Sequence, residues 1–505
     1  MHRQPFLLPA LLLLTALRLA VLPLHELSPL ESYAVVCGDH NGLWHAMLGP
    51  VLPTMVHITT TIFGANEFGV RVLAPLIILG ASWMLWLAAR GLFDAQTAAW
   101  GVVFFNVLPA VNLAAVTFTP MTLSIALSVA LLLGLRRALH REHKWHLPWW
   151  IVSGVLCLSF FTDWRMILFA VSASAALAVT SRGRRALMKW PVLPIAGGAL
   201  GVVVTVFLAW GSEHRWIAFY TFPDTPPVSF TSTVWRFLLA HPLPVLAALI
   251  WALMQNVKRK PMTYPVAFLL AFGLPMMTLD VLAFGAQPWP QCGYCGWIAP
   301  SVLLLAHQLR LWQPMNLSIK PLARFLVLAL TTAQSCLILQ TDCVRRSGIV
   351  WKLNAQTVEE TGWLPADPSR DLMGWRDLAA ALHVIMQEQQ GNLHVAPLIV
   401  ADRWQLAAPL SVYLNDLPLA QPSADYMSVF LSPNSGKLTP FSYRPGLSAE
   451  LMASAPVLFI TDQVDKKAPP KSLTTHYHSI KLVGLFKLKH HDLTLRTVKV
   501  FACQP

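Results

Sequence analysis

Residues 67–93 read EFGVRVLAPLIILGASWMLWLAARGLF, an apolar stretch with basic residues near both ends. A membrane-spanning helix needs about 20 predominantly apolar residues. Residues 70–89 meet that length, and the following Arg90 supplies a basic end. Several other stretches of similar length and composition occur along the chain. The sequence therefore predicts an α-helical polytopic membrane protein.

The composition supports this class of protein. Of the 505 residues, 55% are hydrophobic and only 12% are charged, and the mean hydropathy is +0.54. This is too apolar for a soluble globular protein. The net charge of +13 is not gathered on a nucleic-acid-binding module. We expect the basic residues to anchor loops at anionic lipid surfaces instead.

Counting the apolar stretches predicts about eleven membrane helices. They run roughly over residues 6–23, 70–89, 98–117, 122–135, 149–161, 166–180, 192–210, 234–253, 264–284, 297–311 and 322–339. Residues 47–63 are also apolar but carry Pro53, His57 and four threonines. This stretch is interpreted as an interfacial helix.

Basic residues gather in alternate loops, which predicts a cytoplasmic N-terminus by the positive-inside rule. An odd number of spans then places the C-terminal segment outside the membrane. We expect a membrane domain over residues 1–342, with outer loops at 24–69, 211–233 and 285–296, and a periplasmic domain over residues 343–505. The three outer loops can converge on one cavity at the membrane face.

The C-terminal segment changes pattern. Residues 374–389 and 403–414 have helical spacing, and residues 394–402 and 455–462 are short apolar runs that end in Asp. Residues 481–488 and 493–501 flank a turn and predict a hairpin. Strands that alternate with helices predict a small α/β domain with a mainly parallel sheet and an antiparallel edge.

The order of these segments resembles a known family. Residues 67–93 are followed by FTPMT (118–122), SFFTDWRMILF (159–169) and QPWPQCGYCGWIAPSVLLLA (287–306). The arrangement looks like the GT-C membrane glycosyltransferases of the family 39 type, the relatives of protein mannosyltransferases and aminoarabinose transferases. The resemblance spans nearly the whole chain.

The resemblance implies an inverting transferase in the inner (cytoplasmic) membrane. Such an enzyme moves a sugar from a polyprenyl-phosphate carrier to an extracytoplasmic lipid, glycan or protein acceptor, often with a divalent cation such as Mg or Mn. Three positions that are acidic in the family are apolar here, namely Leu30, Met47 and Met121. A catalytically degenerate scaffold that binds a lipid-linked sugar or a protein partner is the alternative. A transporter fits the long outer loops less well.

The candidate catalytic residues lie in the first outer loop. They are Glu31, Asp39 and His40, since carboxylates and imidazoles move protons and ligate metals. The candidates for binding substrate or lipid phosphate are Tyr33, His45, Asp163, Arg165, His214, Arg215 and Trp289. Other readings stay open: a helix-end charge at Glu31, a local ion pair of Asp163 with Arg165, and an interfacial anchor at Trp289.

Four cysteines are expected outside the membrane, where disulfides persist. Cys292 and Cys295 have CxxC spacing, and Cys343 and Cys503 bracket the C-terminal domain. Either pair can form a disulfide. The CxxC spacing can also begin a zinc site, although no second cysteine pair completes it.

Overall fold

The computed structural model describes the greater part of the chain in two compact units. The described residues are 6–38, 44–45, 48–140, 147–188, 192–214, 216, 247, 250, 254, 263–284, 295–311, 324–326, 328–333, 371–393, 395, 397–416, 429–431, 455–463, 468–490 and 493–504. The first unit, here called the helical unit, comprises Met1–Leu22, Leu48–Trp210 and Pro227–Leu339. The second, the sheet unit, comprises Pro23–Met47, Gly211–Pro226 and Gln340–Pro505. The predicted domain boundary at residues 342–343 stays a prediction.

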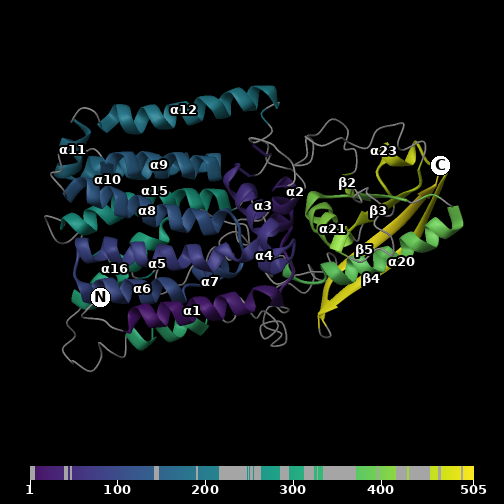
Figure 1. Ribbon diagram of the computed structural model, residues 1–505, viewed down its shortest axis with the longest axis horizontal. Helices are drawn as coiled ribbons and strands as arrows, with labels where there is room; N and C mark the ends of the chain where they lie inside the picture. Colours follow the sequence, from purple (N-terminus) through teal and green to yellow (C-terminus); the bar gives the residue numbers. More distant parts are fainter. Residues whose placement is uncertain are drawn as a thin grey trace. The chain divides into compact units, whose positions relative to one another are not determined.

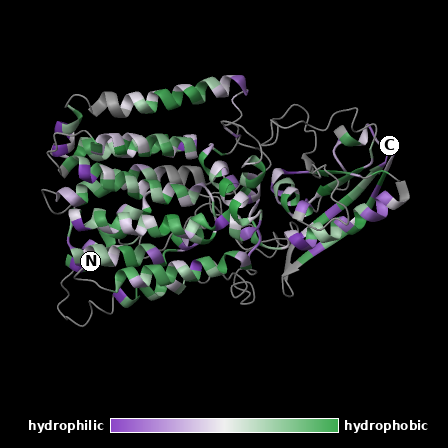
Figure 2. Ribbon diagram, in the orientation of Figure 1, coloured by the Kyte–Doolittle hydropathy of each residue, from purple (hydrophilic) through white to green (hydrophobic). Residues whose placement is uncertain are grey.

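The helical unit is built from apolar helices that lie side by side (Figure 1). They are α1 (Leu7–Val21), α3 (Val51–Phe63), α4 (Glu67–Arg71), α5 (Leu73–Leu92), α6 (Ala95–Val107), α7 (Pro109–Val116), α8 (Pro120–His140), α9 (Leu147–Thr162), α10 (Leu168–Val179), α11 (Ser181–Leu187), α12 (Val192–Glu213), α15 (Tyr264–Phe284) and α16 (Ile298–Leu311). Figure 2 shows that apolar residues dominate along the long helices of this unit, whereas the short α11 is basic. Their positions follow the apolar stretches of the sequence, because a helix satisfies its own backbone hydrogen bonds in a lipid environment.

Three described helical stretches are long and apolar enough to cross a membrane, namely Leu7–Leu24, Glu67–Leu92 and Pro120–Leu139. Two bent pairs raise this number to five if each pair is one span: Ala95–Val107 with Pro109–Val116, and Trp164–Val179 with Ser181–Leu187. Most of the predicted span 234–253 and half of the predicted span 322–339 lie outside the described residues. The total of about eleven spans therefore stays a prediction.

The bend between α6 and α7 measures 64° and has a definite chemical support. Pro109 opens α7, and a proline has no N–H to continue the hydrogen-bond ladder of α6. Arg18 of α1 donates to Asn106 O at 3.1 Å and to Asn106 Oδ1 at 3.0 Å, and also to Asn112 Oδ1 at 2.7 Å. A buried arginine thus bridges the end of α6 and the start of α7.

The sheet unit holds a five-stranded sheet in the order β2-β1-β3-β5-β4. Its strands are β1 (Leu398–Ala401), β2 (Val429–Leu431), β3 (Val457–Thr461), β4 (Ser479–His490) and β5 (Leu493–Gln504). β2, β1 and β3 are parallel, whereas β5 pairs antiparallel with both β3 and β4. The predicted α/β fold with a parallel core and an antiparallel hairpin at its edge is confirmed.

Two long helices accompany the sheet, α20 (Trp375–Leu393) and α21 (Trp404–Asp416), together with the short α23 (Lys471–Thr474). α2 (Pro29–Gly38), from the first predicted outer loop, packs along α21. One core cluster joins the sheet to α23 and the segment after it; its buried members are Val400, Val457, Phe459, Leu473, Tyr477, Phe501 and Cys503. β1 and β3 are continuous apolar runs in the sequence because both of their faces are buried.

Candidate functional site

Glu31 lies in the first turn of α2 and forms a capping box with Ser28. The Ser28 N–H donates to Glu31 Oε2 at 2.9 Å, and the Glu31 N–H donates to Ser28 Oγ at 3.3 Å. Both side chains are fully buried. Pro29 occupies the first helical position, where a missing N–H costs nothing. The segment Ser-Pro-Leu-Glu therefore begins a helix, and any chemical role of Glu31 comes in addition to this structural one.

Tyr33 is buried between helices of the sheet unit. Its ring meets the ring of Trp404 edge to face, with centroids 5.9 Å apart and an interplanar angle of 63°. Both residues are almost fully buried. This contact holds α2 against α21. A direct contact of Tyr33 with substrate stays a prediction.

The remaining candidates of the first outer loop are only partly described. His45 is 3% exposed and follows the buried Trp44. Asp39 and His40 lie outside the described residues.

Asp163 and Arg165 form the clearest polar constellation of the helical unit. They lie at the break after α9, where the short helix η2 (Trp164–Ile167) begins. Asp163 accepts the Arg165 backbone N–H at 2.9 Å. Its carboxylate also pairs side by side with the guanidinium, with Nε–Oδ1 at 3.0 Å and Nη2–Oδ2 at 2.7 Å. Asp163 is 2% exposed and the Arg165 side chain 28%, so the pair presents a partly exposed, oriented cation.

Aromatic packing fixes this break in place. The Trp164 ring stacks on Phe207 of α12 with centroids 6.2 Å apart, and Phe160 meets the same ring edge to face at 5.4 Å. Both ends of η2 are therefore tied down, one by the Asp163 cap and the other by α10. Such fixed geometry orients the partly exposed guanidinium for a charge-assisted contact with an anion.

Gly49 brings the segment just before α3 to the same break. Its N–H donates to Thr162 O at 3.0 Å, and a Cβ at this position would lie 2.0 Å from Phe161 O. Only glycine allows so close a backbone approach. Within the helical unit, the start of α3 and the Asp163–Arg165 pair are thus neighbours.

The Thr122 hydroxyl forms hydrogen bonds with the backbone at the break before α8, at residues 118–122. The Thr122 Oγ1 lies 2.8 Å from Ala114 O and 2.9 Å from Thr117 O, and it accepts the Thr119 N–H at 3.5 Å. Pro120 begins the new helix, and Met121, at 4% exposure, is buried. The backbone of the break is satisfied by threonine, and the side chain at position 121 is a buried thioether.

The other predicted site residues are scattered or undescribed. His214 is exposed just after the end of α12. Arg215 and Trp289 lie outside the described residues, as do Cys292 and Cys343. Roles in substrate binding for these residues stay predictions.

Two of the four predicted disulfide cysteines are described. Cys295 is buried and has a φ of 40°, in the left-handed region, just before α16. Cys503 is a fully buried thiol of β5, opposite Val457 and Ile480 in the neighbouring strands. Burial raises the pKa of Cys503 to about 11, which makes its thiol a poor nucleophile. Both predicted pairings need a cysteine outside the described residues.

A metal site needs several ligand side chains close together in the described part of the chain. Within this part of the chain, no group of three or more His, Cys, Asp or Glu side chains could hold a metal ion. Glu31 uses Oε2 to accept the Ser28 N–H, and Asp163 uses both oxygens for Arg165. The described carboxylates therefore do not fit a divalent cation, and no chemical step is assigned to one.

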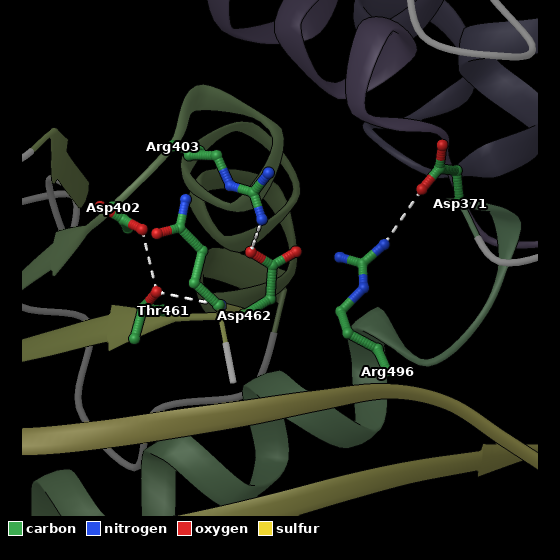
Figure 3. A network of polar contacts seen from close by, with 7 residues as sticks. Asp371, Asp402, Arg403, Thr461, Asp462 and Arg496 are labelled. Carbon is green, nitrogen blue, oxygen red and sulfur yellow. Dashed lines mark hydrogen bonds and ion pairs between the residues drawn. The ribbon is translucent and has the colours of Figure 1, made fainter. Parts of the chain in front are cut away.

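A second polar cluster lies at the carboxyl ends of β1 and β3 (Figure 3). Thr461 donates to Asp402 at 2.9 Å, and Arg403 forms an ion pair with Asp462. Ligands of open α/β sheets often bind at such edges. Here these side chains pair with one another, which favours a role in joining the two loops.

This architecture is similar to that of known membrane proteins. Residues 45–210 match the family model described as dolichyl-phosphate-mannose-protein mannosyltransferase. The comparison with curated proteins gives no match. The fold matches the crystal structure of ArnT from Cupriavidus metallidurans in the apo state, with a TM-score of 0.62 and 13% identity over 99% of this chain and 98% of that chain.

Two further structures are similar. The same ArnT bound to undecaprenyl phosphate gives a TM-score of 0.59 and 12% identity over 98% of this chain and 97% of that chain. The arabinofuranosyltransferase AftD from Mycobacteria gives a TM-score of 0.51 and 14% identity over 99% of this chain and 40% of that chain. The chain thus has the fold of the GT-C membrane glycosyltransferases, as its sequence predicts.

Three residues that make long-range polar contacts, Arg18, Glu26 and Arg496, are not among the predicted candidates. The sequence does indicate a structural role for Arg18, since an arginine within an apolar span needs polar partners. No local pattern in the sequence indicates the contacts of Glu26 and Arg496. The partner of Glu26 lies 349 residues away along the chain, and the partner of Arg496 lies 125 residues away.

Proposed function

We propose that this protein is an integral membrane glycosyltransferase that moves a sugar from a polyprenyl-phosphate carrier to an extracytoplasmic acceptor. The observation that carries the proposal is the ArnT fold along 99% of the chain, joined to a mannosyltransferase family match over residues 45–210. The ArnT relative binds undecaprenyl phosphate, which supports a polyprenyl phosphate as the carrier here. The acceptor is a lipid, glycan or protein.

The proposed location is the inner membrane, with a cytoplasmic N-terminus and a periplasmic sheet unit. The distribution of basic residues supports this orientation. A carrier lipid then reaches the helical unit from the bilayer. The acceptor arrives from outside.

The chemistry needs a base and a cation. As the acceptor hydroxyl attacks the anomeric carbon, its proton passes to a base while the bond from that carbon to the phosphate oxygen breaks. The carrier leaves as a phosphate with one more negative charge, which a guanidinium stabilises. We assign the phosphate to Arg165, because Asp163 orients its guanidinium and 28% of its side chain is exposed.

We assign the base to Glu31, with Asp39 and His40 as the other candidates. General-base catalysis contributes about 10²- to 10⁴-fold in rate. Tyr33, His45, His214, Arg215 and Trp289 complete the proposed substrate contacts. A requirement for Mg or Mn would depend on Asp39 and His40, and chelation by EDTA tests it.

A catalytically degenerate scaffold is the second candidate function. It is favoured by the apolar side chains at Leu30, Met47 and Met121, and by the capping role of Glu31. Such a protein would bind a lipid-linked sugar or a protein partner without turnover.

The experiment that separates these functions is transfer of radiolabelled sugar from membrane polyprenyl-phosphate donors. Glu31→Gln keeps an acceptor for the Ser28 N–H and so retains the capping box, but it removes the base. Glu31→Ala removes both. If Glu31 is the base, both variants lose transfer by at least about 100-fold, and only Glu31→Ala also lowers thermal stability.

Persistence of transfer in Glu31→Gln would move the base to Asp39 or His40. Lipid binding without transfer from any donor by the wild-type protein would favour the scaffold. Arg185→Gln, on the exposed face of α11, is the control for any change of charge.

A further inference from the structure

The carboxylate of Glu26 attaches the beginning of the first outer loop to the N-terminus of α20. Glu26 Oε2 accepts the Trp375 N–H at 2.5 Å, and Oε1 accepts the Arg376 N–H at 3.3 Å. These are orphan donors at the start of α20, 349 and 350 residues further along the chain. The Glu26 N–H in turn donates to Leu372 O at 3.0 Å. A helix N-terminus favours a carboxylate, both by hydrogen bonds and by its dipole.

Two more contacts extend this attachment along the loop. The Leu27 N–H donates to the Tyr413 hydroxyl oxygen of α21 at 2.6 Å, and Leu27 is 1% exposed. Further on, Tyr33 of α2 meets Trp404 of α21. The loop is therefore tied at its start and again along α2.

The receiving turn, residues 371–376, is itself held to the sheet. Arg496 of β5 donates to Asp371 Oδ1 at 3.0 Å, as Figure 3 shows, and its guanidinium lies 3.9 Å from the centre of the Trp375 ring. The Trp375 Nε1 donates to Asp371 O at 3.0 Å. Arg496 is 4% exposed. A fixed turn presents its backbone donors to Glu26 without a further ordering cost.

We propose that Glu26 and Tyr413 are positioning residues for glycosyl transfer, and that the turn 371–376 and α21 orient residues 24–38 of the first outer loop within the sheet unit. This inference rests on the proposed function. Ser28, the N-cap residue of α2, directly follows Leu27, and its capping box with Glu31 starts the helix. The attachment of Glu26 and Leu27 therefore fixes the start of α2 and, with it, the position of the Glu31 carboxylate.

A contact that positions a catalytic group affects the rate of the chemical step, whereas a contact without this role leaves that rate unchanged. Misplacing a catalytic group by about 1 Å can cost about 100-fold in rate while substrate binding persists. Loss of the attachment should therefore lower kcat and leave the KM for the lipid-linked donor within about twofold.

The experiment compares Tyr413→Phe with Tyr477→Phe in the full-length protein in lipid nanodiscs. Each substitution removes one hydroxyl from the sheet unit. The Tyr413 hydroxyl accepts from the loop, whereas the Tyr477 hydroxyl donates to Ala455 O at 3.3 Å, away from the loop. A second pair is Glu26→Gln against Glu388→Gln on the exposed side of α20.

Two readouts are taken on each variant. Amide hydrogen exchange over residues 24–38 reports the attachment, and it should quicken by roughly tenfold in Tyr413→Phe, since a buried N–H loses its acceptor. The kcat, counted per protein that binds polyprenyl phosphate, should fall by at least about tenfold in Tyr413→Phe and Glu26→Gln. Both controls should leave both quantities unchanged.

A loop that exchanges faster with an unchanged kcat would overturn the proposal. An equal loss of kcat in Tyr477→Phe would also overturn it, because the effect would then be a general loss of stability. Absence of transfer by the wild-type protein would instead refute the proposed function, and the exchange data would still report the attachment.

Discussion

Two buried arginines, Arg18 in the helical unit and Arg496 in the sheet unit, have different kinds of partner. Arg18 in the helical unit is 5% exposed, and it donates hydrogen bonds to two asparagine side chains and one backbone carbonyl. Arg496 in the sheet unit is 4% exposed and meets a carboxylate and an aromatic ring. Arg18 donates hydrogen bonds to neutral oxygens at a helix break. The charge of Arg496 is neutralised by its ion pair with Asp371.

The difference follows from what each unit must satisfy. A broken helix in an apolar bundle leaves carbonyl oxygens without partners, and a guanidinium supplies several donors in a fixed plane. In the sheet unit the secondary structure satisfies most of the backbone, so charged side chains are available to fasten loops to one another. Arg18 therefore supports a single helical break, whereas Arg496 supports the turn to which a distant loop is attached.

Arg18→Met tests the helical side of this comparison and should have the largest effect. The change leaves Asn106 O, Asn106 Oδ1 and Asn112 Oδ1 without their donor. We expect a loss of about 3 kcal/mol or more in the free energy of unfolding. Unfolding in mixed detergent micelles measures it, with Arg185→Met as the exposed control. A loss below about 0.5 kcal/mol would mean that the break does not depend on Arg18.

Arg496→Met tests the other side. Asp371 loses its partner, but its side chain is 18% exposed and water can reach it. The expected loss is therefore smaller, about 2 kcal/mol, including the contact with Trp375. Adding Asp371→Asn should recover part of the loss in a double-mutant cycle. Additive single effects would contradict the ion pair.

Gly49→Ala sharpens the comparison, because it alters a backbone contact between the segment before α3 and the end of α9 that involves no charged side chain. The new methyl group would lie 2.0 Å from Phe161 O, so the start of α3 must move away from α9. We expect a cost of about 1–3 kcal/mol and reduced transfer. Gly154→Ala on α9 is the control, since a Cβ there meets nothing within 4 Å. Equal behaviour of the two variants would contradict the close approach.

The pH dependence of Glu26 gives the smallest effect. Burial raises the pKa of Glu26, against the opposing influence of the Trp375 and Arg376 N–H groups. A raised pKa contributes stability below the ordinary pKa of glutamate, and this contribution is lost as pH rises through the raised value. The stability difference between the wild type and Glu26→Gln should therefore shift against the wild type between about pH 4 and about pH 8. Thermal unfolding across that range measures it, and a constant difference would contradict the shift.

The sequence predicted those features that depend on local pattern. The apolar runs predicted α5, α9, α15 and α16 closely, and the strand-then-Asp pattern predicted β1 and β3. The turn at residues 489–492 predicted the β4–β5 hairpin. A local ion pair of Asp163 with Arg165 was one of the interpretations that their spacing left open, and the structure contains this pair.

Long-range features could not be read in this way. The Ser28–Glu31 spacing is a capping-box signal, but the same carboxylate also suits catalysis, and a sequence alone does not separate the two roles. The attachment of Glu26 to Trp375 depends on a turn 349 residues away. The approach of Gly49 to Phe161 depends on how two helices pack.

The most direct test of the central claim is multiple turnover by the wild-type protein. Purified protein in lipid nanodiscs is given a radiolabelled polyprenyl-phosphate sugar and a membrane extract as acceptor, and released polyprenyl phosphate is counted per protein. A transferase releases many carriers per protein, and Arg165→Gln lowers that number by at least about tenfold. Binding of one carrier per protein, with no release above that of lipid alone, would contradict the account and identify the chain as a scaffold.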